Sequence, residues 1–515
     1  MVDPRARAVA VRAAELALAL GVELSDDLAL WSLAGGRPDA GPVPGRPEDL
    51  GELLEASIQP HDRHHRGAHY TPEELAADLV ERALIGHVGP TICDPSCGGG
   101  SLLLAAGRQQ VASGASAREV VTRLWGIDID PLAVATTQAA LALWSGTTPP
   151  RLNFVVADML VAPPDLPSFD VVIGNPPFLS QLGVSTARSA SESMLLKERF
   201  GNAVLAYTDP AALFLLAACT LTRRGGTVAM VQPQAVLAAR DAAGVRAAVN
   251  EVADLREVMV PPGRPFEASV EVCVPILDVG PSTSETVPWS AHLARALGVP
   301  RADLRAEGTI GDEATTGAAF RTEYYGLVPH VHEASSRPDG RPLLTTGLVD
   351  LAAHSWGERP ARIGGRVWQR PVVDVPSLEG RAAAWVARTS TPKLIIATQT
   401  RVVEATVDLD GQFVPGVPLV VAWASADRLW ALAAALCSPP VTAWVAERTA
   451  GSALASRALK LTAALVRQVP LPADRGAWRV GTAALRAGEL ERYAEAMTAA
   501  YGNPSGVLAW WMDRL

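Results

Sequence analysis

The stretch that decides the fold reads Phe169-Asp-Val-Val-Ile-Gly-Asn-Pro-Pro-Phe178. Its apolar and β-branched residues predict a buried strand that ends at Gly174, with Asn-Pro-Pro-Phe in the loop that follows. In open α/β sheets, the carboxyl ends of the strands are where ligands bind. The prolines leave their carbonyls able to accept hydrogen bonds, and the side-chain oxygen of Asn175 is a further acceptor. Acceptors beside the ring of Phe178 suit an amino group on a planar ring, and a turn that merely ends the strand is the alternative.

Three strands predicted upstream of this stretch each end in an acidic side chain, and they cover residues 91–94, 124–128 and 153–157. Asp94 opens the turn Asp-Pro-Ser-Cys-Gly-Gly-Gly-Ser, which leads into a helix and lets the backbone approach a ligand closely. Asp128 ends the second strand, where an acid can bind ribose hydroxyls. Asp158 follows the third strand. The sequence therefore predicts three carboxylates and the amide of Asn175 at one edge of a sheet.

The remaining pattern predicts the other elements of this domain. Thr71-Pro-Glu-Glu74 is typical of a helix start, with Thr71 as N-cap and a glutamate closing a capping box. The polar stretch 180–202 is interpreted as a loop over the site. Further helices are expected at 5–33 (one or two), 71–85, 131–144, 211–222 and 241–252, and further strands at 227–231, 255–260 and 270–277.

Length and composition bound the class of protein. A chain of 515 residues predicts two or more domains, because a single core stops growing near about 250–300 residues. The net charge of −9 argues against a general polyanion binder, although a local basic face can still bind nucleic acid. Five dispersed cysteines predict free thiols, and no uninterrupted apolar run is long enough to span a membrane. Because the charged N-terminus is not typical of a signal peptide, we expect a cytoplasmic protein.

Four histidines lie between His61 and His69. Their spacing matches no familiar zinc pattern, and no cysteine or acidic cluster joins them. We therefore expect no metal, and a basic loop near a phosphate or a ligand is the favoured interpretation.

Downstream of Thr309 the hydrophobic pattern weakens and a new unit is predicted. It contains a basic run interleaved with tryptophans, made of Arg359, Arg362, Arg366, Arg370, Arg381, Arg388, Lys393 and Arg401 with Trp356, Trp368 and Trp385. Such a run is typical of contact with phosphates and bases, and Arg366 and Arg370 are the candidate DNA-binding residues. A solvated arginine-rich face is the alternative.

Three motifs, in this order, resemble those of S-adenosylmethionine-dependent amino-methyltransferases: the turn at 94–101, the segment Gly126-Ile-Asp-Ile-Asp-Pro131 and the loop at 175–178. With Tyr70-Thr-Pro72 upstream and a long C-terminal region, the chain resembles the gamma class of adenine-N6 DNA methyltransferases, the restriction-modification N-6 DNA methylases. The resemblance covers residues 67 to about 279 and extends more loosely to a target-recognition domain. It implies an α/β fold, with a Rossmann-like seven-stranded methyltransferase domain and a C-terminal α+β target-recognition domain.

The resemblance also implies roles for the matching residues. The residues that would bind S-adenosyl-L-methionine are Thr71, Asp94, Pro95, Ser96, Gly98, Gly100, Asp128, Ile129, Asp158, Met159 and Phe214. Those that would act on the target amine are Asn175, Pro176, Pro177 and Phe178, with Phe266 as a second aromatic against the base. The chain departs from many members of the family at His69 and Phe178, where tyrosine is commoner; phenylalanine can still stack on a base.

The implied reaction is methyl transfer to the N6 amine of adenine in double-stranded DNA. The lone pair of an aromatic amine is delocalised into the ring, so acceptors at Asn175 and the Pro176 carbonyl would localise it by binding both N6 hydrogens. A stacked duplex hides N6, so base flipping is implied. Subunits of a restriction or defence system are candidate partners, and no membrane partner is expected.

Three other functions remain open on the sequence. Glutamine-N5 protein methyltransferases share the Asn-Pro-Pro loop, but they are shorter and lack a large basic C-terminal unit. An rRNA adenine methyltransferase is another alternative. A catalytically idle DNA-binding subunit of a defence complex is the last, which the intact motifs disfavour.

The sequence is divided into five predicted segments. These are an N-terminal helical segment (1–60), the catalytic domain (61–285), a connecting segment (286–345), the target-recognition domain (346–475) and C-terminal helices (476–515). No chemistry is assigned to the first segment, for which a helical cap or a docking element is the interpretation.

Overall fold

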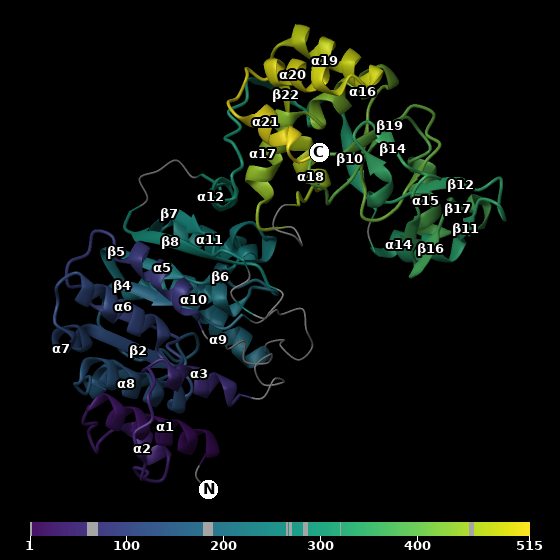
Figure 1. The fold of residues 1–515 in the computed structure, drawn as a ribbon. Coiled ribbons are helices and arrows are strands. Elements are labelled where there is room, and N and C mark those ends of the chain that lie inside the picture. The colour runs from purple at the N-terminus through teal and green to yellow at the C-terminus, as the bar shows by residue number, and fades with distance from the viewer. Residues whose placement is uncertain are drawn as a thin grey trace. The chain divides into compact units, whose positions relative to one another are not determined.

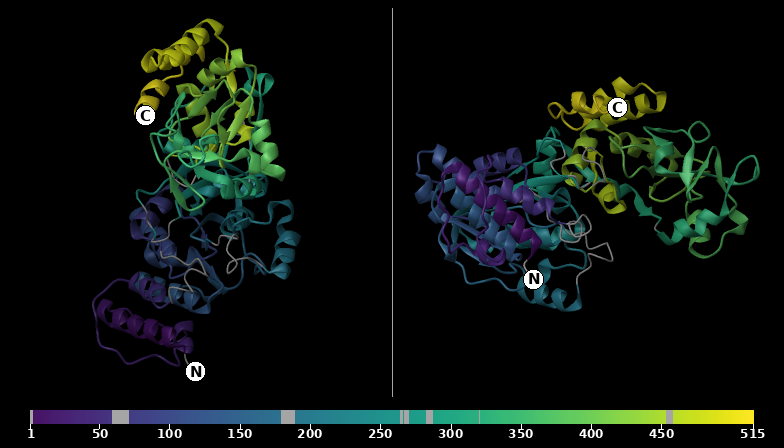
Figure 2. Two further views of the ribbon diagram at one scale, coloured as in Figure 1. Left: turned by 90° about the vertical axis from the view of Figure 1, so that its right-hand side faces the viewer. Right: turned by 60° about the horizontal axis from the view of Figure 1, so that its bottom comes forward.

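The computed structural model describes residues 3–58, 71–178, 189–263, 266, 270–281, 287–319, 321–452 and 458–515. The chain forms two compact units, Met1–Trp289 and Ser290–Leu515, each with its own sheets and helices (Figures 1 and 2). The finer division of each unit into the predicted segments stays a prediction.

The first unit is built on an eight-stranded sheet. Its strand order is β3-β2-β1-β4-β5-β8-β6, and β7 also pairs with β8. The strands are β1 (Ile92–Asp94), β2 (Leu124–Asp128), β3 (Phe154–Val156), β4 (Phe169–Gly174), β5 (Thr222–Met230), β6 (Gln232–Pro233), β7 (Ala253–Met259) and β8 (Val272–Val279). Strands β1 to β5 are parallel where they pair, and β8 is antiparallel to its neighbours. The predicted Rossmann-like α/β fold is confirmed; the sheet has eight strands where seven were predicted, because β6 also pairs with β8.

Two helices on this sheet, α8 (Pro131–Ser145) and α10 (Pro210–Leu221), begin at an aspartate cap followed by a proline. Asp130 accepts a hydrogen bond from the backbone N–H of Leu132 at 2.9 Å, and Pro131 takes the first position of α8. Asp209 and Pro210 repeat this arrangement at α10. The other helices of the sheet region are α5 (Glu73–Ala83), α6 (Ser101–Ala112), α7 (Ala117–Val120), α9 (Ala190–Phe200) and α11 (Ala243–Asn250).

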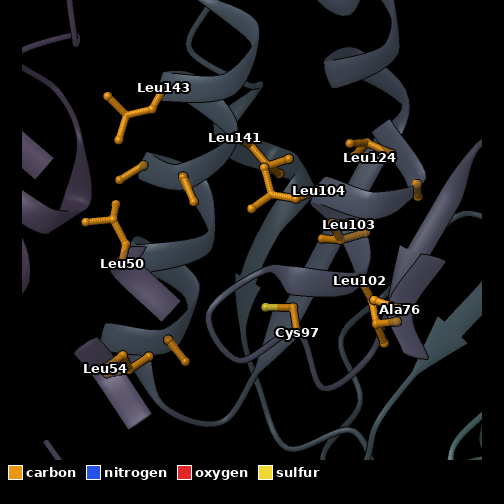
Figure 3. Close-up of a cluster of buried hydrophobic side chains, with 14 of the residues drawn as sticks. Leu50, Leu54, Ala76, Cys97, Leu102, Leu103, Leu104, Leu124, Leu141 and Leu143 are labelled. Atoms are coloured by element: carbon orange, nitrogen blue, oxygen red, sulfur yellow. The ribbon is translucent and has the colours of Figure 1, made fainter. Parts of the chain in front are cut away.

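Three N-terminal helices pack on α8 and join the core of the first unit. They are α1 (Pro4–Leu20), α2 (Ala29–Leu33) and α3 (Asp49–Ala56). Helices at 5–33 were predicted and are confirmed, whereas α3 was not predicted. Figure 3 shows Leu50 and Leu54 of α3 in one cluster with Leu141 and Leu143 of α8. The N-terminal segment is therefore part of the core of the first unit.

Two local predictions are wrong. Thr71 is not the N-cap of α5, because Pro72 occupies that position and no side chain caps the helix. The stretch 189–200, predicted as a loop, is instead the helix α9 capped by Ser189, while residues 179–188 lie outside the described part of the chain.

The second unit mixes short strands and helices, as predicted for an α+β domain. One four-stranded sheet has the strand order β10 (Thr315–Ala318), β21 (Val420–Trp423), β18 (Lys393–Ile396) and β19 (Ala405–Asp408). The other has the strand order β11 (Val331–Glu333), β17 (Pro371–Val373), β12 (Arg341–Leu344) and β20 (Val414–Pro415). Two-stranded pairs are β13 (Val349–Asp350) with β14 (Ala353–His354), β15 (Ala361–Ile363) with β16 (Arg366–Trp368), and β22 (Pro470–Pro472) with β9 (Ala306–Thr309).

The remaining helices of the chain follow β8, and most of them are labelled in Figure 1. They are α12 (Trp289–Ala296), which begins at the boundary of the units, α13 (Ile310–Glu313), α14 (Arg321–Leu327), α15 (Gly380–Arg388), α16 (Ala426–Leu436), α17 (Pro439–Thr449), α18 (Ala463–Gln468), α19 (Arg475–Ala487), α20 (Leu490–Ala500) and α21 (Val507–Met512). Within the described residues, no single helix has the length and apolarity of a membrane span, although α16 and α17, bent by 65°, meet that test as a pair.

Candidate active site

The strand ends of the first unit meet at one edge of the sheet. Because β1 to β4 are parallel, Asp94, Asp128, Asp158 and Asn175 all follow carboxyl ends at that edge. A cavity of about 780 Å³ opens there, within the size range of small-molecule sites. The predicted residues that line it are Pro95, Ser96, Gly98, Asp128, Ile129, Asp158, Met159, Asn175, Pro177 and Phe214.

The glycine turn after β1 is held on both sides. Gly98 has a φ of +51°, a left-handed conformation that glycine adopts without strain. Its N–H donates to the Asp128 carboxylate at 3.0 Å, and its carbonyl accepts from the hydroxyl of Thr137 at 2.7 Å. Gly100 lies at the N-terminus of α6 with a φ of +88°. The turn therefore presents backbone to the cavity in a fixed conformation.

Asp128 is the best-held acid on the cavity wall. One carboxylate oxygen accepts from Gly98, and the other accepts the backbone N–H of Asp130 at 2.9 Å. Burial raises the pKa of Asp128, and these two N–H donors oppose that rise. Beside it, Ile129 has 67% of its surface exposed, so the wall carries an apolar side chain next to a carboxylate. That pair suits a ribose joined to an aromatic base.

Asp94 lies behind the cavity wall. It is 1% exposed and accepts the backbone N–H of Ser96 at 3.0 Å, and Ser96 itself lines the cavity. Burial, with a smaller contribution from the charge of Asp128, raises the pKa of Asp94 to about 7. Its position is therefore that of a residue that shapes the turn.

The wall after β3 is closed by α9. Asp158 accepts the backbone N–H groups of Leu160 and Val161 at 2.9 and 3.0 Å. Arg199 of α9 donates to the carbonyls of Met159 and Leu160, and Glu192 of the same helix lines the cavity. The loop interpretation of this stretch missed both side chains, although Ser189 followed by Glu192 carries the spacing of a helix N-terminus.

The side chain of Asn175 is oriented by Thr71, a residue outside the sheet. Its amide nitrogen donates to the hydroxyl of Thr71 at 3.1 Å, and Thr71 is buried. Since the donor end of the carboxamide faces Thr71, the acceptor oxygen lies at the opposite end of that group. Thr71, predicted as a helix cap and cofactor ligand, here orients the amide of the Asn-Pro-Pro loop.

Two aromatic rings stand next to this loop. The rings of Phe178 and Phe266 are 6.2 Å apart between centroids, with an angle of 72° between their planes. Phe266 is buried and Phe178 half-buried. The predicted residues Thr71, Asp94, Gly100, Pro176, Phe178 and Phe266 do not line the cavity itself.

The N-terminal helices supply a wall that sequence reasoning missed. The cavity is lined by Asp3, Arg5 and Ala6 of the α1 region, by Leu33 of α2, and by Gly51, Leu54, Glu55 and Ile58 in and after α3. The amphipathic pattern of these helices indicated a buried face, but it did not indicate which surface covers that face.

The basic run of the second unit is not one surface. Lys393 is fully buried against Asp408, and Trp385 is buried with its ring N–H bonded to the Pro415 carbonyl at 2.9 Å, so neither is available to a phosphate or a base. Arg359 pairs with Asp350. The prediction of one continuous basic and aromatic footprint is therefore wrong for Lys393 and Trp385, which are buried.

The rest of that run remains at the surface. Arg362 and Arg366 are exposed on the hairpin formed by β15 and β16, whose turn consists of Gly364 and Gly365 at φ of +58° and +77°. Arg370 is exposed, with its guanidinium 5.0 Å from the ring centroid of Trp356. The candidates Arg366 and Arg370 thus lie on and just after one hairpin.

The histidine cluster His61–His69 lies outside the described residues. Among the residues that are described, no group of three histidine, cysteine or acidic side chains is placed to hold a metal ion. All five cysteines are buried and free.

Comparisons with known proteins find similarity in the first unit. Residues 47–287 match the family model described as N-6 DNA methylase. A type II methyltransferase, M.VspI of Vibrio sp. (strain 343), is 25% identical over 224 residues, which are 43% of this chain and 50% of that protein. The chain thus matches about half the length of this curated relative.

A solved structure resembles this chain over most of its length. The type IIL restriction-modification enzyme MmeI, determined in complex with DNA, aligns with 94% of this chain and 82% of its own chain. The TM-score is 0.59 and the sequence identity 13%. At that identity the likeness concerns the fold.

Proposed function

Because residues 47–287 belong to the N-6 DNA methylase family, we propose that this chain transfers a methyl group from S-adenosylmethionine to the N6 amine of adenine in duplex DNA. The observation that carries the proposal is the edge of the sheet, where Asp128 and Asn175 face one cavity. We place this activity in a restriction-modification or phage-defence system, in the cytoplasm where such DNA is found.

The cavity suits this cofactor by charge and by surface. Among the described residues, six carboxylates line it (Asp3, Glu55, Asp128, Asp130, Asp158 and Glu192), against one guanidinium, that of Arg5. A sulfonium cation is favoured in such a field. Asp128 offers carboxylate oxygens to ribose hydroxyls, while Ile129, Met159 and Phe214 offer apolar surface to the adenine. When bound, S-adenosylmethionine supplies an electrophilic methyl group.

The chain's own contribution to catalysis is to orient and activate the target amine. Thr71 holds the Asn175 amide so that its oxygen can accept one N6 hydrogen, and the Pro176 carbonyl accepts the other. Accepting both hydrogens withdraws the nitrogen lone pair from the ring and makes the amine a better nucleophile. Positioning and electrostatic preorganisation of this kind account for most of what such a site must supply.

The target base must leave the duplex to reach this loop. Phe178 belongs to the same loop as Asn175, and its ring contacts the ring of Phe266 edge to face. Stacking on an aromatic ring offsets about 1–3 kcal/mol of the free energy of unstacking a base. We assign Phe178 to the flipped adenine and Phe266 to the support of that ring.

DNA contact outside the pocket is assigned to the second unit. The hairpin of β15 and β16 carries exposed Arg362 and Arg366, with Arg370 just beyond it. A two-stranded ribbon fits the major groove, and arginines on it can bind phosphates or the edge of guanine. The known structure of MmeI with DNA is in keeping with a DNA substrate for this fold.

Sequencing of modified bases tests the proposal. DNA from a host that expresses the full chain should carry N6-methyladenine at one sequence motif in long-read data. Asn175→Ala should abolish that mark, whereas Asn202→Ala, which removes an exposed amide outside the cavity, should leave it intact. Methylation of glutamine in a host protein, of rRNA, or of nothing at all would contradict the proposal.

A further inference from the structure

Residues 3–56 reach the cofactor side of the cavity through two separate sets of contacts. One set is polar and ends on Asp128, and the other is a backbone contact on the glycine turn. Neither contact was indicated by the methyltransferase motifs, which begin after residue 67.

The polar set begins at the N-terminus of α1. Asp3 caps that helix and binds the Arg5 guanidinium, with 2.9 Å between Oδ2 and Nη2. The other terminal nitrogen of Arg5 lies 3.7 Å from a carboxylate oxygen of Asp130. Asp130 in turn donates its backbone N–H to Asp128, and Asp128 accepts from Gly98. Arg5 is therefore connected through Asp130 to Asp128, the proposed ribose ligand, and through Asp128 to the glycine turn.

The backbone contact joins α3 to the same turn. A methyl group added at Gly99 would lie 2.3 Å from the Cα of Gly51 and within 3.4 Å of two more of its backbone atoms. Such atoms cannot move aside as a side chain can, so the absence of a side chain at Gly99 is required by α3.

Two ion pairs fix α3 in that place. Arg12 of α1 lies 2.6 Å from Asp49, and Arg108 of α6 lies 2.5 Å from Glu48. Arg108 belongs to the helix that starts from the glycine turn. The turn is thus held between α3 on one side and its own helix on the other.

We infer that the N-terminal helices are a working part of the cofactor site: Arg5 is a positioning residue for Asp128, and α3 holds the glycine turn in its binding conformation. The inference rests on the proposed function, since it takes S-adenosylmethionine as the ligand. It predicts that cofactor affinity depends on residues far upstream of the methyltransferase motifs.

The expected size of the effect differs between the two contacts. The side chains of Arg5 and Asp130 are 30% and 21% exposed, so water screens their attraction and the loss of Arg5 should weaken binding only about three- to tenfold. Gly99→Ala forces α3 and the turn apart, and we expect a loss of roughly tenfold or more.

The first experiment is a calorimetric titration of the full-length chain with S-adenosylmethionine. Arg5→Ala should lower the affinity, and Arg5→Lys should restore most of it because the ammonium can still approach Asp130. Arg7→Ala is the matched control: it removes the same charge from an exposed position of the same helix, away from the cavity. In steady-state assays, Arg5→Ala should raise KM for the cofactor and leave kcat and KM for DNA near the wild-type values.

The second experiment compares two glycines. Gly99→Ala should weaken cofactor binding, while Gly41→Ala should not, since a methyl group there meets nothing within 4 Å. Unfolding temperatures of the same variants distinguish a loss of cofactor binding from a loss of folding. If Gly99→Ala does not fold, the result for Arg5→Ala decides the question.

The outcomes distinguish this inference from the proposed function. Wild-type affinity in both Arg5→Ala and Gly99→Ala overturns the inference and leaves the proposed function standing. Failure of the wild-type chain to bind the cofactor overturns both. Equal losses in Arg5→Ala and Arg7→Ala also overturn it, because the effect would then be one of net charge.

Discussion

The strand-end edge of the first unit and the basic run of the second unit differ in how their polar side chains are arranged. At the edge, residues from four separate strands lie around one cavity. In the basic run, Lys393 and Trp385 are buried, Arg359 is paired with Asp350, and Arg366 is exposed on a hairpin. Topology places the first set, because parallel strands end at one edge. Composition alone does not place the second.

The largest effect is expected for Lys393→Ala, which tests whether this member of the basic run is buried. Burial lowers the pKa of Lys393, and its ion pair with Asp408 opposes that shift. Removing the ammonium leaves a buried carboxylate, so the second unit should lose about 3–5 kcal/mol of stability. Denaturant unfolding measures the loss, and Arg401→Ala, at an exposed position of the same run, is the control. A loss of stability below about 0.5 kcal/mol, as for ordinary surface substitutions, would contradict the burial of Lys393.

Asp128→Ala tests whether the strand-end edge of the first unit binds the cofactor. It removes charge-assisted hydrogen bonds to the ribose and should weaken S-adenosylmethionine binding by about 1.5–3 kcal/mol. Calorimetry on the folded variant gives the value, and Asp165→Ala, an exposed acid outside the cavity, provides the comparison. If the affinity for S-adenosylmethionine is unchanged, Asp130 becomes the candidate for binding the ribose.

The buried acid of the same edge makes stability depend on pH. The pKa of Asp94 is raised from 3.8 to about 7, so between these values the folded chain holds a proton that the unfolded chain releases. Stability should therefore fall as pH rises from 4 to 7, by up to about 1.4 kcal/mol per pH unit. Asn keeps an acceptor for Ser96, so Asp94→Asn should remove this contribution. Identical pH profiles of unfolding for the two proteins would place the titration elsewhere.

The smallest expected effect concerns the exposed part of the basic run. Arg366→Ala and Arg370→Ala should each flatten the dependence of log DNA affinity on log salt by roughly one unit for each lost phosphate contact. Arg492→Ala should not, because that arginine already pairs with Glu489. Unchanged slopes in both variants would make this hairpin a solvated face.

The structure also indicates what the sequence could and could not predict. The pattern of 169–178 predicted β4 and its loop, because a run of apolar β-branched residues followed by Asn-Pro-Pro permits little else. Thr71 was misread because its capping pattern is local, whereas its hydroxyl accepts from Asn175, far along the chain. Arg5 and Gly51 were missed for the same reason: an amphipathic helix indicates that a face is buried, but not against what. The burial of Lys393 likewise depends on Asp408, with which it pairs across β18 and β19.

The position of Asp3 has a practical consequence. This residue is the N-cap of α1 and lines the cavity. An extended chain advances at most about 3.6 Å per residue, so an affinity tag, a reporter or another domain joined directly before Asp3 starts on the rim of the cavity. A fusion made there can obstruct ligand entry or pull on α1, whereas the same addition after Leu515 extends from the second unit. Whatever is attached directly before Asp3 should therefore be treated as a change to the site.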